Sequence, residues 1–268
     1  WIKSRSRTDK HTAWDSVRTA GNCLFPSENN ADESQGTGVT AFGSNGFSLG
    51  AMNDVNYSSA TFVAWAWKES ATAGFDIVSF TGSGSAKTES HSLSAKPNYM
   101  IFKNRATTDA WTVYSDKKGA THGSFLNQTN IWEDSTSPFN DTEPTSSVFT
   151  VGAGAGTNGD GNAMIAYCFA EKQGFSKFGS YTGNGNADGP FIITGFKPAF
   201  LLIKNTTSTS DWNMRDSKRG EWPPGNPRQW ILLANTSAAE STSATYAIDL
   251  LANGFKARAT INNENTDD

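Results

Sequence analysis

Short apolar runs separated by polar turns dominate this chain of 268 residues. Residues 62–67 alternate large and small side chains with a period of two, which predicts a strand whose two faces are buried to different depths. Similar short runs predict further strands at residues 75–81, 97–103, 112–114, 175–182, 191–194, 198–204 and 228–234.

The polar segments between these runs carry the turn chemistry of β proteins. Asn-Gly pairs begin at Asn45, Asn158, Asn184 and Asn253, and this dipeptide is the strongest short signal for a hairpin. Residues 237–251 come nearest to a helix, but β-branched side chains interrupt them. We therefore predict an all-β fold of tandem β-sandwich or jelly-roll-like units, with about six strands in each unit.

The chain also repeats itself with a period of about 100 residues. A residue type that recurs in one slot of every copy belongs more often to the scaffold than to an active site. The recurring slots include Lys3, Lys103 and Lys204, then His11, Trp111 and Trp212, then Arg18, Lys118 and Arg219.

The repeat divides the chain into a partial first unit (residues 1–70), a complete second unit (71–171) and a third unit (172–268) that lacks its last strand. We expect open sheet edges where strands are missing, and such edges seek partners. Either the ends are limits of a longer chain or neighbouring subunits donate strands. The units form either three beads or one pseudo-threefold body.

Composition narrows the class of protein. Hydrophobic residues make up 36% and charged residues 18%, and 17 Phe and 9 Trp supply large apolar areas from few positions. The net charge is −4 with no basic stripe, so we do not expect nucleic acid as a partner. No apolar stretch is long enough for a bilayer, so we do not expect membrane insertion.

No catalytic constellation stands out. Asp15, Asp116 and Asp216 occur one in each unit beside a serine, which favours turn or strand-end capping over paired glycosidase carboxylates. The histidines have no recognisable nucleophile or orienting acid nearby. Cys23 and Cys168 occupy unrelated slots, so we expect free thiols. We predict no enzymatic activity, no catalytic residues and no cofactor.

Two loops have a superficial ligand-binding appearance. Residues 152–156 (GAGAG) lack the Lys-Ser/Thr ending of a phosphate loop, so we interpret them as a glycine-rich β loop. Asn184, Asn186 and Asp188 resemble the start of a calcium loop, but the first ligand is neutral and Gly195 stands where the last acid belongs. They form only a weak calcium candidate, and we predict no metal site.

Aromatic side chains are the best candidates for recognition, because sugar faces stack on aromatic rings. Trp111 and Trp212 recur in the repeat, which favours core packing, whereas Trp132 and Trp222 lie in loops that are not repeated. We predict a glycan-binding role for these four residues, most of all for Trp132 and Trp222.

Residues 1–9 (WIKSRSRTD), 15–18 (DSVR) and above all 175–204 carry a resemblance. The chain resembles a repeat domain of unknown function found in virion structural and tail-fibre-like proteins of marine bacteriophages, including cyanophages. The resemblance implies a place on the surface of a phage particle. It brings no catalytic residues with it.

These observations lead to one main hypothesis and two alternatives. We expect a non-enzymatic virion appendage protein, such as a tail fibre or spike, that forms homo-oligomers, contacts other virion proteins and binds host-surface polysaccharide. The first alternative is a tailspike-like glycan hydrolase. The second is a surface filament whose subunits exchange strands.

Overall fold

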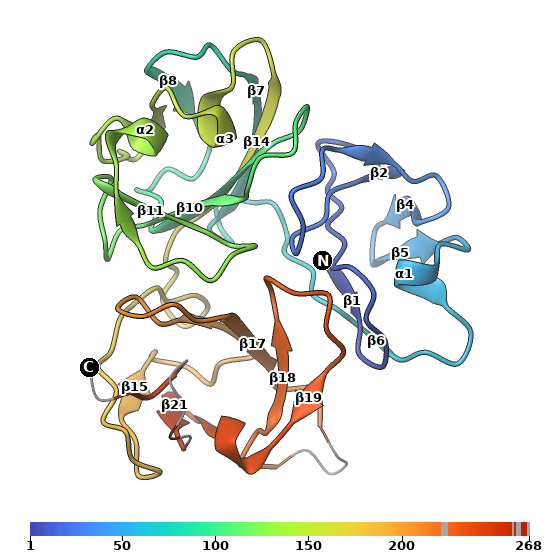
Figure 1. The fold of residues 1–268 in the computed structure, drawn as a ribbon, viewed down its shortest axis with the longest axis vertical. Helices are drawn as coiled ribbons and strands as arrows, with labels where there is room; N and C mark the ends of the chain where they lie inside the picture. Colours follow the sequence, from blue (N-terminus) through green and yellow to red (C-terminus); the bar gives the residue numbers. More distant parts are fainter. Residues whose placement is uncertain (221–224, 259, 261–263, 267–268) are drawn as a thin grey trace.

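The computed structural model describes residues 1–220, 225–258, 260 and 264–266. It is predominantly β, with several small sheets and three single-turn helices among the described residues. Figure 1 shows three lobes around a common centre: lobe 1 (residues 1–70, blue), lobe 2 (71–171, green) and lobe 3 (172–268, orange). The three lobes share one central core, so they form one body rather than separate beads.

Lobe 1 is built from two-stranded pieces. Strand β1 pairs with β6, β2 pairs with β3, and β4 and β5 form a hairpin, all antiparallel. Its elements are β1 (Ile2–Ser4), β2 (Asn22–Cys23), β3 (Glu33–Ser34), β4 (Val39–Gly43), β5 (Gly46–Leu49), α1 (Asn53–Asn56) and β6 (Phe62–Ala64).

Lobe 2 holds the largest sheet, an antiparallel sheet in the order β12-β11-β10-β9-β14-β7, and a separate pair of strands, β13 and β8. Its strands are β7 (Phe75–Thr81), β8 (Lys87–Ser90), β9 (Tyr99–Asn104), β10 (Thr112–Ser115), β11 (His122–Phe125), β12 (Glu133–Asp134), β13 (Val148–Val151) and β14 (Ala163–Phe169). Its helices are α2 (Thr136–Phe139) and α3 (Ala155–Asn158).

Lobe 3 has a four-stranded sheet in the order β16-β17-β18-β19 and a three-stranded sheet in the order β15-β21-β20. Its elements are β15 (Phe191–Ile193), β16 (Phe200–Lys204), β17 (Trp212–Asp216), β18 (Trp230–Leu233), β19 (Ser241–Thr242), the 3₁₀ turn η1 (Ala244–Tyr246), β20 (Ile248–Leu251) and β21 (Gly254–Ala257).

Strand register places the same slots of the three lobes in the same positions. Each lobe has a short antiparallel pair of strands that follows its aromatic slot (His11, Trp111 or Trp212) in the sequence. In that pair, Cys23 lies opposite Glu33, Gly123 opposite Glu133 and Ile231 opposite Ser241.

Most of the predicted strands are present, and one is absent. Residues 75–81, 97–103, 112–114, 191–194, 198–204 and 228–234 all contain strands, and the Asn-Gly pairs at Asn45 and Asn253 form hairpins. The strand expected at 175–182 does not form. Its equivalent, β7, is held by pairing with β14, and lobe 3 has no counterpart of β14 among its described residues.

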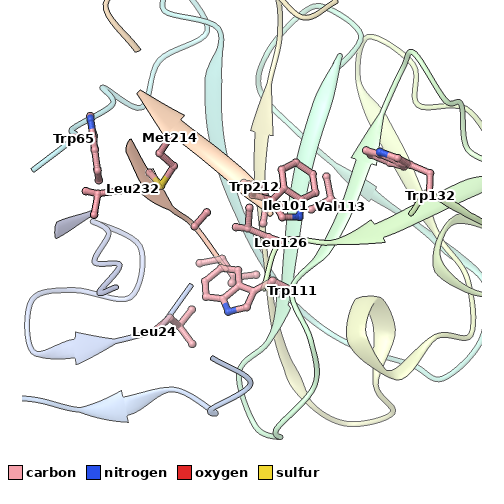
Figure 2. Close-up of a cluster of buried hydrophobic side chains, with 12 residues drawn as sticks. Leu24, Trp65, Ile101, Trp111, Val113, Leu126, Trp132, Trp212, Met214 and Leu232 are labelled. Carbon is pink, nitrogen blue, oxygen red and sulfur yellow. The ribbon is translucent and has the colours of Figure 1, made fainter. Parts of the chain in front are cut away.

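The central core draws aromatic and aliphatic side chains from all three lobes (Figure 2). It gathers Leu24, Trp65, Ile101, Trp111, Val113, Leu126, Trp132, Ile165, Trp212, Met214, Leu232 and Ala234. Each lobe adds a smaller cluster of its own. Because the lobes bury their largest side chains against one another, removing one lobe would expose the core of the other two.

Candidate functional site

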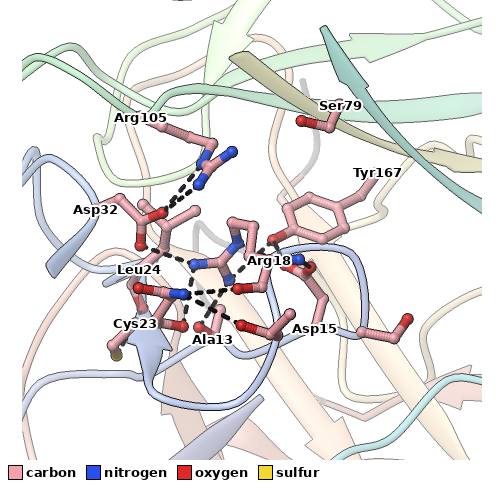
Figure 3. Close-up of polar contacts among 12 residues, drawn as sticks. Ala13, Asp15, Arg18, Cys23, Leu24, Asp32, Ser79, Arg105 and Tyr167 are labelled. Atoms are coloured by element: carbon pink, nitrogen blue, oxygen red, sulfur yellow. Dashed lines mark hydrogen bonds and ion pairs between the residues drawn. The ribbon is translucent and has the colours of Figure 1, made fainter. Parts of the chain in front are cut away.

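Buried charges gather where lobes 1 and 2 meet (Figure 3). The Arg18 guanidinium is buried and pairs with Asp15 at 2.6 Å and with Asp32 at 3.0 Å. From lobe 2, Arg105 pairs with Asp32 at 2.8 Å, and the Tyr167 hydroxyl donates to Asp15 at 2.7 Å. Burial lowers the pKa of Arg18, but these partners outweigh burial and raise it above its usual value.

The junction of lobes 3 and 1 repeats this network. Arg219 pairs with Asp216 at 2.5 Å and with Glu240 at 2.7 Å. From lobe 1, Arg5 pairs with Glu240 at 2.6 Å, and the Trp65 indole N–H donates to Asp216 at 3.2 Å. Burial alone would raise the pKa of Asp216, but Arg219 holds it below its usual value.

The junction of lobes 2 and 3 is different. Trp132 stands in the slot of Asp32 and Glu240, and Ser115 in the slot of Asp15 and Asp216. Trp132 is buried and meets the Trp212 ring edge-on at 6.5 Å between centroids. An apolar contact therefore replaces the ionic network at this one junction.

The predicted capping role is confirmed for two of the three aspartates. Asp15 accepts a hydrogen bond from the Arg18 backbone N–H, and Asp216 accepts from the N–H groups of Lys218 and Arg219. Asp116 instead accepts from the Asn98 side chain. Sequence reasoning missed the second role of Asp15 and Asp216. Each pairs with a buried arginine of its own lobe and accepts a hydrogen bond from an aromatic side chain of the neighbouring lobe.

A lysine in each lobe reaches a backbone carbonyl of a neighbouring lobe. Lys3 Nζ donates to Ser237 O at 3.2 Å, Lys103 Nζ to Asn29 O at 3.1 Å, and Lys204 Nζ to Thr129 O at 3.2 Å. Burial lowers the pKa of each of these lysines to about 8. The recurring lysine slot is thus a clamp that closes a ring of three lobes.

The recurring aromatic slot closes the same ring. Trp111 Nε1 donates to Phe25 O at 3.0 Å, and Trp212 Nε1 donates to Phe125 O at 2.9 Å, each across a junction. In lobe 1 this slot holds His11, which is fully buried and accepts from Trp1 Nε1 at 2.8 Å. Burial lowers the pKa of His11 well below its usual value, against the opposing effect of the Leu233 carbonyl.

The predicted glycan-binding tryptophans have core positions. Trp111, Trp132 and Trp212 are 2%, 8% and 2% exposed, so their ring faces are not available for stacking on a sugar. The core packing that the repeat favours for Trp111 and Trp212 is confirmed, and the glycan-binding role predicted for Trp132 is wrong because its ring is buried at the junction with lobe 3. Trp222 lies outside the described residues.

The calcium-loop candidate is a loop held by its own side chains. The side-chain oxygens of Asn184 and Asn186 accept hydrogen bonds from the backbone N–H groups of Asn186 and Asp188. Asp188 pairs with Lys256. Among the described residues, no group of three or more His, Cys, Asp or Glu is placed to hold a metal ion.

Both cysteines are free and buried, as predicted. Burial raises the pKa of each thiol above its usual value. A protonated, inaccessible thiol is a poor nucleophile and a poor metal ligand. Cys23 and Cys168 therefore behave as small apolar side chains in the packing of lobes 1 and 2.

The glycine-rich segment at 152–156 lies beside a pocket of lobe 2. The pocket has a volume of about 300 Å³ and lies between β10, β11, β12 and the single-turn helices α2 and α3. Its lining includes acidic, hydroxyl and apolar residues, namely Asp109, Thr112, Phe125, Glu133, Ser137 and Pro138. Gly154 and Gly156 complete one wall. Sequence reasoning treated this loop as scaffold and did not predict a cavity next to it.

A family model for a domain of unknown function, DUF7483, matches residues 1–267. The chain belongs to this family. The match spans all three lobes. No curated protein matches the chain, and no solved structure does. None of the helices in the described part of the chain is long and apolar enough to cross a membrane.

Proposed function

We propose that this chain is a non-enzymatic structural module of a bacteriophage virion appendage, such as a tail fibre or spike. One observation carries the proposal. The arginines, carboxylates, lysines and indoles of the recurring slots and their partners are engaged in contacts within and between lobes. These contacts join the three lobes into a ring, so the residues that make them serve to hold the structure together. The resemblance of residues 175–204 to virion proteins supports the location in this proposal.

Such a ring suits a part exposed on a particle. Opening either ionic junction breaks an ion pair between lobes, Arg105–Asp32 or Arg5–Glu240, and opening the third exposes the Trp132 and Trp212 rings. We infer that each lobe is a version of one jelly-roll-like unit, that the protein is a homo-oligomer contacting other virion proteins, and that outward loops bind host polysaccharide.

The location is tested on particles. Antibodies raised against the recombinant chain would be used for immunogold electron microscopy of the phage that encodes it. We expect gold on an appendage. Label confined to lysed cells, with none on particles, would contradict the proposal.

Activity is tested separately from location. The recombinant chain would be incubated with host polysaccharide, and new reducing ends would be measured against a known glycosidase. We expect none. A steady release of reducing ends would instead support the tailspike-like hydrolase.

A second candidate, strand exchange between copies, rests on one observation in lobe 1. Strands β13 and β21 each take a partner, β8 and β15, whereas the equivalent β5 pairs only with β4 among the described strands. The β4–β5 hairpin is exposed, and Phe42, Phe47 and Leu49 are 45%, 40% and 39% accessible. An exposed two-stranded hairpin with apolar side chains is a template for a further strand.

Strand exchange is tested by the oligomeric state. If a second copy supplies the missing strand, light scattering after size exclusion shows a dimer or larger species for the natural chain. Phe47→Glu should then give a monomer, while Val17→Glu, at an exposed apolar position outside the hairpin, should not. A natural chain that stays monomeric at high concentration would remove this candidate.

A further inference from the structure

The pocket of lobe 2 exists because lobe 2 has small residues where lobe 1 has larger ones. Ala110 occupies the slot of Lys10, whose Nζ lies 4.7 Å from the centre of the Phe25 ring. Lys10 helps to cover Phe25, which is only 1% exposed. Without a lysine above it, the equivalent Phe125 is half-buried and lines the pocket.

Two glycines enlarge the same space. Gly123 takes the place of Cys23 in lobe 1 and of Ile231 in lobe 3. Gly156 takes the place of Asp54, the acidic residue of α1. A β-carbon added at Gly156 would lie 2.9 Å from Thr112 Oγ1. Any side chain there would therefore approach the Thr112 hydroxyl and begin to close the pocket.

Thr112 supplies an unused hydrogen-bonding group. The residue is 3% exposed and lines the pocket, and its hydroxyl makes no hydrogen bond with the part of the chain that the structure describes. The equivalent Thr12 of lobe 1 donates to Ile2 O at 3.3 Å. Because Thr112 lines the pocket, its hydroxyl is placed to bond a ligand hydroxyl or a water there.

The lining indicates the chemistry of the ligand. Asp109 and Glu133 bring two carboxyl groups and no lysine or arginine lines the pocket, which disfavours anionic ligands. Hydroxyls of Thr112 and Ser137 lie with the apolar groups of Phe125 and Pro138. The volume of about 300 Å³ is at the small end of the range typical of ligand pockets.

We propose that this pocket binds a single neutral sugar unit. Carboxylates and hydroxyls would bond the sugar hydroxyls, and Phe125 and Pro138 would face its C–H groups. The site deepens the glycan-binding part of the function proposed above and rests on it. It also moves that binding from the tryptophans to the pocket of lobe 2.

The test is a titration followed by amide NMR of the labelled full chain. The probes are the methyl glycosides of glucose, galactose and mannose, with methyl glucuronide as an anionic sugar and ethylamine as a cation. We expect at least one neutral glycoside to shift the amides of Thr112, Gly123 and Gly156 with millimolar affinity. Glucuronide should bind at least tenfold more weakly.

Two variants locate the site. Ala110→Lys imitates lobe 1 and should abolish the shifts, while Ala51→Lys adds the same side chain at an exposed position and should leave them unchanged. Thr112→Val keeps the shape of the side chain and should weaken binding about three- to tenfold, as expected for one lost hydrogen bond.

Each other outcome overturns the site. Shifts that persist in Ala110→Lys place binding elsewhere, ethylamine binding alone makes it a cation site, and no shift with any neutral glycoside removes it. None of these results bears on the location of the chain, because immunogold labelling of particles does not depend on sugar binding. Failure of the site and failure of the virion role are therefore distinguishable.

Discussion

At the junction of lobes 1 and 2 the Arg18 guanidinium lies buried between Asp15 and Asp32, whereas the same place between lobes 2 and 3 holds the Trp132 ring. Both junctions carry the lysine clamp. The ionic junction depends on every member being present, since each charge needs its partner. The aromatic junction depends on shape and buried area.

This difference shows that a position repeated in the three lobes determines where a contact forms but not whether that contact is ionic or apolar. The equivalent position is occupied by Asp32 in lobe 1, by Trp132 in lobe 2 and by Glu240 in lobe 3. Where this residue changes from an acid to tryptophan, the residues in the associated slots change as well. At the junction of lobes 2 and 3, Ser115 and Thr206 occupy the slots that Asp15 and Arg105 occupy at the junction of lobes 1 and 2.

The largest effect is expected from Arg18→Ala. The substitution leaves Asp15 and Asp32 without their shared buried cation, so the free energy of unfolding should fall by about 3–5 kcal/mol. Urea unfolding followed by fluorescence measures it. Lys117→Ala removes an exposed ion pair with Asp116 and should change little. A loss below about 1 kcal/mol for Arg18→Ala would mean that the ionic network is not what holds this junction.

Trp132→Leu tests the aromatic junction. The smaller side chain keeps the contact apolar but leaves a gap against Trp212, so we expect a loss of about 2 kcal/mol. Because no charge is exposed, this loss should be the same in low and high salt, unlike that of Arg18→Ala. A salt-dependent loss would contradict the conclusion that the junction of lobes 2 and 3 is apolar.

The lysine clamps give a pH-dependent effect. Burial lowers the pKa of Lys103 to about 8 in the folded chain, while it is near 10.5 when unfolded. Between these values the unfolded state binds more protons, so rising pH stabilises the folded state. Relative to Lys103→Met, the natural chain should gain about 1–2 kcal/mol from pH 7.5 to pH 10. Thermal unfolding at both pH values measures the difference, and a constant difference would contradict it.

The smallest effect is expected from Trp111→Phe. It removes the indole N–H that donates to the carbonyls of Phe25 and Glu28 but keeps most of the ring. We expect a loss of about 0.5–1.5 kcal/mol in urea unfolding. Trp212→Phe should cost the same, because its N–H makes the equivalent bond to Phe125 O. Unequal losses of unfolding free energy would show that the two indole hydrogen bonds do not stabilise their junctions equally.

Much of the fold could be predicted from local pattern. Alternating apolar runs located β7, β9 and β16, and Asn45 and Asn253 located two hairpins, because these signals lie within a few residues. The strand expected at 175–182 could not be judged in this way. A strand forms only where a neighbour completes its ladder, and that neighbour is not local in sequence.

The candidate sites were less predictable for the same reason. Trp132 was singled out because its loop is not repeated, yet the ring is buried against Trp212 from another lobe. The pocket was missed because it is made by what lobe 2 lacks at Ala110, Gly123 and Gly156. Small residues do not by themselves indicate a cavity, which can be recognised only when the positions of the surrounding residues are known.

The sequence by itself determined the strand content, the hairpins and the threefold recurrence of slots, since each is written in residue spacing. Only the tertiary structure decided that the recurring lysines and tryptophans reach into neighbouring lobes to close a ring. It also decided that two junctions are ionic and one is aromatic, and that a pocket lies in lobe 2. These are relations between residues far apart in the chain, and burial and charge pairing act only after folding brings those residues together.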